Sequence, residues 1–254
     1  MPDISLTKKQ KYRSLLCICI LIYLAALLVR MVKITLDPTL SRDGATYLVW
    51  VENWIATGAF YFDFFRRVGI VPPLSLWTIK TLAQTTGLDV EIAGRGISMF
   101  FGSVFPVIGF FFTLRLCRNI RIALFAALLL IFHPDLVHYS GQPLRENCYV
   151  FCTGILMIVL VEAVRESSTF KWALCGIFLA LSTFCRYEGL EFVLIVPFVL
   201  GAMCYFGKIK VKDMVRNAAV FFLAFVLSVI PLLACADFEP RLFGRLKVFA
   251  DMLF

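Results

Sequence analysis

The segment SLLCICILIYLAALLVRMV, residues 14–32, is an almost uninterrupted apolar run. A helix of about 20 mainly apolar residues is long enough to cross the hydrocarbon core of a bilayer. Basic residues cluster just before the run, at Lys8, Lys9, Lys11 and Arg13. No small-residue cleavage site follows the run, so we expect an uncleaved anchor rather than a signal peptide. The basic cluster places the N-terminus on the cytoplasmic side.

The rest of the chain repeats this pattern. Apolar residues make up 61% of the 254 residues and charged residues 17%, whereas roughly a quarter of a soluble domain is charged. The candidate spans are residues 14–32, 95–115, 120–137, 148–164, 171–185, 190–206 and 217–235. We predict an all-α fold, a polytopic transmembrane helix bundle of about seven spans, with residues 1–254 as a single membrane domain. The third and fifth runs are short, which fits tilted or partly re-entrant helices.

The distribution of charge agrees with seven spans. Segments assigned to the cytoplasm hold 13 Lys and Arg residues, whereas the short outer loops after the third and fifth spans hold one arginine each. This asymmetry is the one that orients membrane proteins. The net charge of +8 therefore reflects topology, and no soluble basic patch indicates a nucleic-acid partner. The absence of an N-x-[ST] sequon is compatible with a bacterial cytoplasmic (inner) membrane.

The first outer loop, residues 33–94, is too polar to span a membrane and too apolar to be a free tail. A helical spacing of apolar residues follows Ser41–Gly44 and ends at Gly58, which predicts an amphipathic interfacial helix. A second helix is expected from Pro72-Pro73 to Thr85-Thr86-Gly87, since proline favours a helix start and glycine its end. These two helices would form a platform where a lipid headgroup and a water-soluble molecule could meet.

Asp43 lies at the entrance of this platform. It could cap the helix or act as a first-turn acid that satisfies free backbone N–H groups. It could also be a general base whose carboxylate faces the outer water layer. The two roles are compatible.

Two further outer loops combine an arginine with an acid. Arg145-Glu146 stands at the lip of a helix, where ionisable residues are functional candidates, although a mutually neutralised, snorkelling pair is an equal alternative. In the other loop, Arg186 could hold a phosphate through two parallel hydrogen bonds, and Glu188 could orient sugar hydroxyls. Ion pairing of Arg186 with Glu188 or Glu146 is the structural alternative.

Metal-ligating patterns are weak. The spacing of His133, Asp135 and His138 matches no strong metal motif. The nine cysteines lie within or next to predicted spans without any CxxC pair, and are interpreted as small buried side chains.

The order of these segments resembles the polytopic GT-C glycosyltransferases that use lipid-phosphate-linked sugars, especially the bacterial group related to protein O-mannosyltransferases and the lipid A aminoarabinose transferase. The matching segments are Arg42–Tyr47, Val71–Leu74, Glu91–Ser98, Ser140–Tyr149 and Arg186–Leu190. In such enzymes the first-loop aspartate is the catalytic carboxylate, which implies that role for Asp43. Many relatives have a second acid directly after it, whereas this chain has Gly44, which argues against a two-carboxylate or metal-assisted variant. Members commonly continue through further spans, so a chain ending at Phe254 fits a truncated record, a compact relative or an inactive remnant.

The resemblance implies sugar transfer from a polyprenyl-phosphate donor to a hydroxyl of a lipid, glycan or protein at the extracytoplasmic face, among membrane lipids. Arg145 and Arg186 would bind the donor phosphate. The remaining candidates, Tyr47, Glu146, Tyr149 and Glu188, would position substrates. No cofactor is expected, with a divalent metal left open. The alternatives are a transporter or flippase-like protein, which would favour mid-membrane charges and repeated halves, and a non-catalytic membrane subunit.

Overall fold

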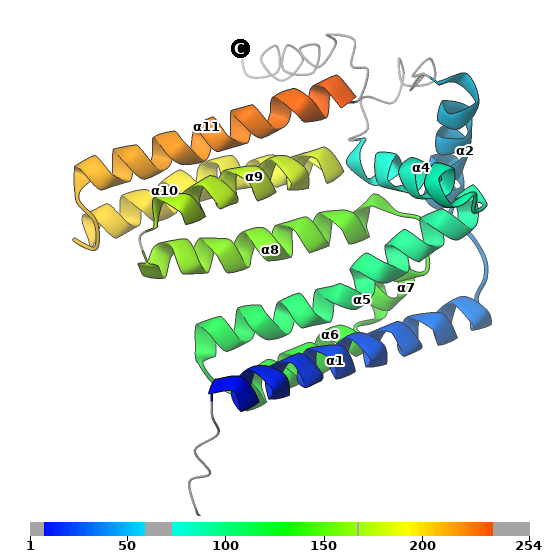
Figure 1. Ribbon diagram of the computed structural model, residues 1–254, viewed down its shortest axis with the longest axis horizontal. Helices are drawn as coiled ribbons and strands as arrows, with labels where there is room; N and C mark the ends of the chain where they lie inside the picture. Colours follow the sequence, from blue (N-terminus) through cyan, green and yellow to red (C-terminus); the bar gives the residue numbers. More distant parts are fainter. Residues whose placement is uncertain (1–7, 59–72, 167, 236–254) are drawn as a thin grey trace, which may run out of the picture.

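The computed structural model describes residues 8–58, 73–166 and 168–235, and these residues contain helices and no strand (Figure 1). This confirms the predicted all-α fold class. The long helices of the bundle are α1 (Lys8–Leu36), α5 (Val90–Cys117), α8 (Arg145–Glu166) and α11 (Val211–Cys235). The shorter ones are α6 (Ile120–Phe132), α7 (Pro134–Ser140), α9 (Thr169–Cys185), the 3-10 turn η1 (Tyr187–Glu191) and α10 (Phe192–Tyr205).

Five of the seven predicted runs overlap one helix each, and the runs at 120–137 and 190–206 each overlap two consecutive helical elements. Among the described residues, five segments are long and apolar enough to cross a membrane: α1, α5, α8, η1 with α10, and α11. The pair α6 and α7 would make a sixth, and α9 is a shorter apolar helix of 17 residues. The protein is therefore a multi-pass membrane protein, and the count of seven crossings stays a prediction.

The predicted span at 120–137 is broken. His133 has an extended backbone (φ −62°, ψ 120°), and α6 and α7 meet there at a bend of 56°. The cause is Pro134, because a proline ring disfavours helical geometry in the residue before it. The proline itself is tolerated at the first position of α7, where no backbone N–H is needed.

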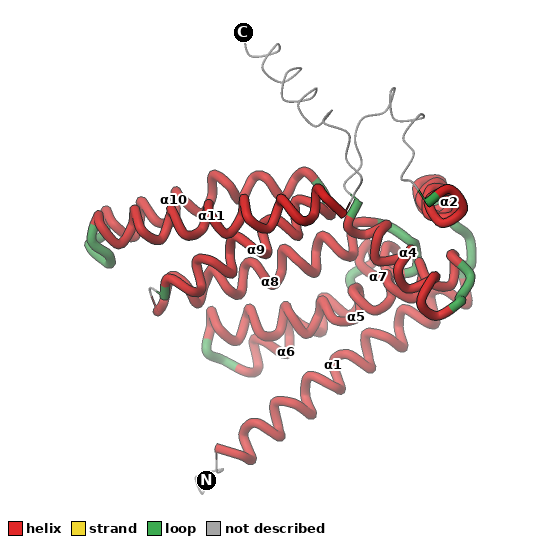
Figure 2. The backbone as a smooth tube through the Cα atoms, turned by 45° about the horizontal axis from the view of Figure 1, so that its top comes forward, coloured by secondary structure: helices red, strands yellow, loops and turns green. Residues whose placement is uncertain are grey.

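The two helices predicted in the first outer loop are present. Helix α2 (Arg42–Thr57) begins at the cap Ser41 and ends at Gly58, and α4 (Leu74–Thr86) begins at Pro73 and ends at Gly87. Pro72 lies outside the described residues. The two helices lie together at one end of the bundle (Figure 2). They bury an apolar cluster that comprises Tyr47, Val51, Trp54, Leu76, Ile79, Ala83 and Ala93.

The other half of the bundle is built on α9. This helix packs between α8 and α11 around the buried residues Trp172, Leu179 and Phe221. Gly176 allows the closest approach: a Cβ atom there would overlap the carbonyl oxygen of Phe221 and come within 2.8 Å of the Phe225 amide nitrogen. Small residues commonly permit such contacts between membrane helices, where packing rather than water exclusion drives association.

We expect Gly176→Ala to destabilise the protein by about 1–3 kcal/mol, because both overlapping atoms belong to the α11 backbone and the helices must separate. Gly201→Ala in α10 is the matched control, since its Cβ would meet no atom within 4 Å. Thermal unfolding in detergent should show a midpoint several degrees lower for Gly176→Ala alone. Equal midpoints for the two variants would contradict the close packing of α9 on α11.

Candidate active site

Arg186 joins the ends of two helices through ion pairs. It follows the last residue of α9, and its Nη1 lies 2.5 Å from Oε1 of Glu146, in the first turn of α8. Its Nη2 and Nε donate to the two carboxylate oxygens of Glu188 at 2.6 and 3.2 Å. The ion-pair alternative for Arg186 is therefore the one found in the structure. The hydrogen bond to Glu188 raises the pKa of Arg186, which stays fully charged.

Arg145 lies beside this cluster and has a different environment. Its guanidinium carbon lies 5.0 Å from the centre of the Tyr47 ring, within range of a cation–π contact. Its Nε is buried without a hydrogen-bond partner, and no carboxylate of the described residues forms an ion pair with it. The alternative of a neutralised Arg145–Glu146 pair is therefore wrong, because Glu146 turns to Arg186. Arg145 is the more available of the two arginines for an incoming anion.

Both arginines are accompanied by a tyrosine. Burial raises the pKa of Tyr47, an effect that nearby Arg145 opposes and that the carboxylates of Glu146 and Asp43 reinforce. Tyr47 therefore stays a neutral phenol, able to donate a hydrogen bond. On the other side of the cluster, the Arg186 guanidinium lies 5.9 Å from the centre of the Tyr149 ring.

Asp43 is exposed in the first turn of α2, four residues before Tyr47. The helix cap is Ser41, whose hydroxyl accepts a hydrogen bond from the amide of Gly44, so Asp43 is a first-turn acid and not the cap. Its carboxylate makes no hydrogen bond or ion pair with another described residue. An exposed, unpaired carboxylate can accept a proton from a bound molecule.

Gln142 ties the start of α2 to the turn that precedes Arg145. Its Oε1 accepts from the backbone amide of Ser41 at 2.8 Å, and its Nε2 donates to the carbonyl of Thr39 at 2.8 Å. Both bonds are formed by a buried side chain. Asp43 and Arg145 are thereby brought to the same end of the bundle, although 101 residues separate Ser41 from Gln142.

The start of α5 completes this connection. Arg95 donates from Nη1 to the carbonyl of Gly141 at 3.1 Å and from Nη2 to the carbonyl of Pro38 at 2.6 Å. Glu91 holds the same guanidinium at 2.8 Å. A Cβ atom on Gly94 would lie 2.9 Å from Cβ of Pro143, so the turn packs directly on α5. Arg95 and Gly94 therefore hold the turn before Arg145 against the start of α5.

Arg30 is a buried arginine that the sequence interpretation missed. It is completely buried in α1, where Nε donates to the Ser140 hydroxyl at 3.1 Å and Nη1 to the carbonyl of Ala26 at 3.0 Å. Its Nη2 has no partner. A charged residue within an apolar run is energetically costly in lipid, so the position of Arg30 in the run 14–32 could have marked it as a buried, paired residue. Arg30 links α1 to the last residue of α7, next to the turn that carries Gln142.

Three thiols lie close together next to the ion pairs of Arg186 with Glu146 and Glu188. Cys148 and Cys152 lie one helical turn apart on α8, and Cys185 is the last residue of α9. The Sγ atom of Cys185 lies 3.1 Å from that of Cys148 and 4.0 Å from that of Cys152, and all three residues are buried. Among the described residues these side chains form the group that could hold a metal, whereas His133, Asp135 and His138 form none.

This convergence predicts that mild oxidation of the membrane-embedded protein with copper–phenanthroline will link Cys185 to a cysteine of α8. The expected product is a disulfide-joined peptide pair, detected by mass spectrometry and absent from Cys185→Ser. Cys117 and Cys204, which lie elsewhere in the bundle, should not appear in it. Recovery of Cys185 only as the free thiol would contradict the packing of α8 and α9 that brings Arg186 to Glu146.

Comparison with known proteins assigns the family. A model of the dolichyl-phosphate-mannose-protein mannosyltransferase family matches residues 71–233. The match includes Arg145, Arg186 and the two glutamates that pair with Arg186, and it begins after Asp43 and Tyr47. No curated protein matches the chain. The matched region is more than half of the chain, contains most of the bundle, and supports the resemblance to GT-C enzymes. The chain belongs to the dolichyl-phosphate-mannose-protein mannosyltransferase family.

Proposed function

We propose that the protein transfers a sugar from a polyprenyl-phosphate-linked donor to an acceptor hydroxyl at the extracytoplasmic face of the membrane. The family supports a glycosyltransferase with a dolichyl-phosphate sugar donor. The observation that carries the proposal is the placement of Arg145, Arg186 and Asp43 at one end of the bundle. Gln142 connects the segments of Asp43 and Arg145, and Glu146 pairs with Arg186. The acceptor hydroxyl would belong to a lipid, a glycan or a protein.

The side of the membrane on which the reaction is proposed follows from the difference in charge between the two ends of the bundle. Helices α2 and α4 lie at the end opposite the α5–α6 turn (Figure 1). That turn carries Arg115, Arg118 and Arg121. Because lysine and arginine accumulate on the cytoplasmic side, the end with Asp43 would face outwards. The N-terminus would then be cytoplasmic, and a bacterial inner membrane would suit this orientation.

In the proposed reaction, the acceptor oxygen bonds to the anomeric carbon as the bond from that carbon to the phosphate oxygen breaks. Asp43 takes the proton of the acceptor hydroxyl, and the transition state has oxocarbenium character. The leaving phosphate gains negative charge, which Arg145 would stabilise most directly because its Nε is unpartnered. Gly44 stands where many relatives have a second acid, so we propose that Asp43 acts without a metal held by paired carboxylates.

The paired groups would position the substrate. Arg186 can share its charge with the phosphate if Glu188, whose side chain is 50% exposed, moves towards solvent. Glu146 has one oxygen on Arg186 and a buried second oxygen, Oε2, without a partner, which is free to accept from a sugar hydroxyl. Tyr47 and Tyr149 flank the arginines and offer phenol groups for further hydrogen bonds.

Asp43→Asn should reduce transfer by at least about 100-fold, since the amide cannot act as a base. Glu52→Gln is the matched control, because Glu52 is an exposed acid on the same helix. Transfer would be measured in membranes with a radiolabelled polyprenyl-phosphate sugar, and both variants should unfold at the same temperature. Near-normal transfer by Asp43→Asn would rule out the general-base role.

Arg145→Ala should lower kcat/KM by roughly 100-fold, equivalent to about 3 kcal/mol of lost transition-state stabilisation, with little change in thermal stability. Arg186→Ala should lower both activity and stability, because it leaves Glu146, with its side chain only 25% exposed, without its counter-charge. Arg216→Ala, at the opposite end of the bundle and paired with Asp213, is the control. Full activity of Arg145→Ala would exclude this arginine from phosphate binding.

A further inference from the structure

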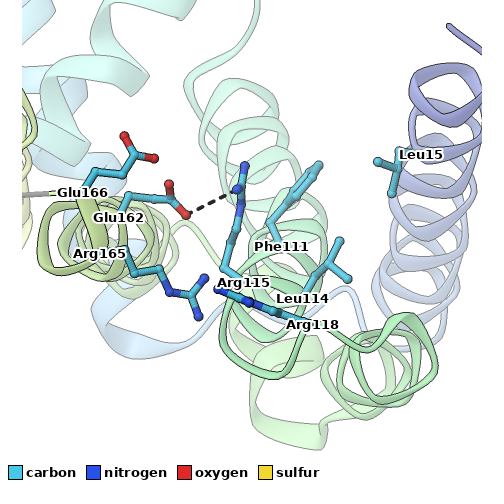
Figure 3. A pocket seen from close by; sticks show the side chains of 8 residues that line it. All are labelled: Leu15, Phe111, Leu114, Arg115, Arg118, Glu162, Arg165 and Glu166. Atoms are coloured by element: carbon cyan, nitrogen blue, oxygen red, sulfur yellow. Dashed lines mark ion pairs between the residues drawn. The ribbon is translucent and has the colours of Figure 1, made fainter. Parts of the chain in front are cut away.

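The opposite end of the bundle contains an open pocket of about 560 Å³ between α1, α5 and α8 (Figure 3). One wall is apolar and consists of Leu15 from α1 with Phe111 and Leu114 from α5. The rim is charged, and its residues come from the last turns of α5 and α8. The pocket therefore combines an apolar surface with an ionic one, and it shares no residue with the candidate active site.

The carboxylates of the rim are already neutralised. Glu162 accepts from Lys171 at 3.2 Å and lies 3.4 Å from Nη1 of Arg115. Glu166 lies 2.6 Å from the same lysine. Four cations therefore face two carboxylates. Arg115 and Lys171 pair with the carboxylates, and Arg118 and Arg165 do not. The rim has an excess of positive charge.

Arg118 and Arg165 carry this excess. Neither forms an ion pair with another described residue. In Figure 3 the side chains of the two arginines extend towards each other across the floor of the pocket. Like charges that converge in this way repel unless an anion lies between them. Two guanidinium groups offer the forked donors that match the oxygens of a phosphate.

The backbone at Arg118 supports a specific role for this side chain. Arg118 caps the end of α5 with φ 53° and ψ 24°, and it is the non-glycine residue in the left-handed region among the described residues. Glycine or asparagine adopts this conformation with less strain. Arg118 therefore adopts a strained backbone conformation at the position from which its side chain enters the pocket.

We propose that this pocket binds the phosphate headgroup of an anionic phospholipid, with an acyl chain lying along Leu15, Phe111 and Leu114. The arginines match the headgroup in charge, and the wall matches the chain in polarity. A free phosphate ester would leave that wall facing water. Basic pockets between transmembrane helices on the cytoplasmic side favour anionic lipid for these reasons. The site is separate from the proposed transfer reaction.

The test is lipid binding by the full-length protein in nanodiscs of phosphatidylglycerol and phosphatidylcholine at equal amounts, followed by native mass spectrometry. The wild-type protein should retain phosphatidylglycerol selectively. Arg118→Gln combined with Arg165→Gln should reduce this retention at least tenfold. Arg216→Gln is the control, as an exposed arginine at the same end that is paired with Asp213.

Glu166→Gln separates binding from misfolding. It removes an exposed carboxylate from the rim and should increase retention of phosphatidylglycerol several-fold, which a misfolded protein would not do. Soluble glycerol phosphate at millimolar concentration should displace the lipid poorly. Three results would overturn the proposal: equal retention by wild-type protein and the double variant, no preference over phosphatidylcholine, or displacement by glycerol phosphate at concentrations near those of the lipid.

Discussion

Backbone N–H and C=O groups find no water in the hydrocarbon core of a membrane, so a segment that crosses it satisfies them within a helix or a closed barrel. In the described part of this chain, the candidate membrane spans are accordingly helical, and the irregular backbone lies at the ends of helices. The ionisable residues of the candidate active site lie in the same places, whereas Arg30 lies within the apolar run of α1. The candidate active site is built from the start of α2, the turn after α7, the start of α8 and the residues that follow α9.

The apolar helices were predictable because helix formation in lipid depends on composition, which is local. Their ends were less predictable. The second predicted span begins at 90 and not at 95, because Asp89 caps the helix and Glu91 pairs with Arg95 inside it. The fourth begins at 145, since charged residues can occupy a first helical turn at the membrane surface. The break at His133 follows from Pro134, a local rule that a search for apolar runs ignores.

The candidate site was predictable in its members and not in its contacts. Arg145, Glu146, Arg186 and Glu188 stood out because each of two short outer loops combines an arginine with an acid. That Glu146 pairs with Arg186 depends on the register of α8 against α9, across 40 residues of chain. The convergence of Cys185 with the two cysteines of α8 has the same origin. The structural role of Gln142 could not be predicted from the sequence, because its hydrogen bonds to Ser41 and Thr39 form only when the start of α2 lies against its loop.

The length of α9 has a consequence for the bilayer itself. Its 17 residues rise about 26 Å, a few ångströms less than a typical hydrocarbon core, and the 13 residues of α6 rise about 20 Å. If these helices cross the bilayer as predicted, the lipid around them must thin, or the ends that carry Arg186 and His133 lie below the plane of the headgroups. In the proposed reaction, a thinner membrane would shorten the distance that the donor phosphate travels to reach Arg145 and Arg186. Membrane thickness, set by acyl-chain length, would then determine how deeply this candidate site is immersed.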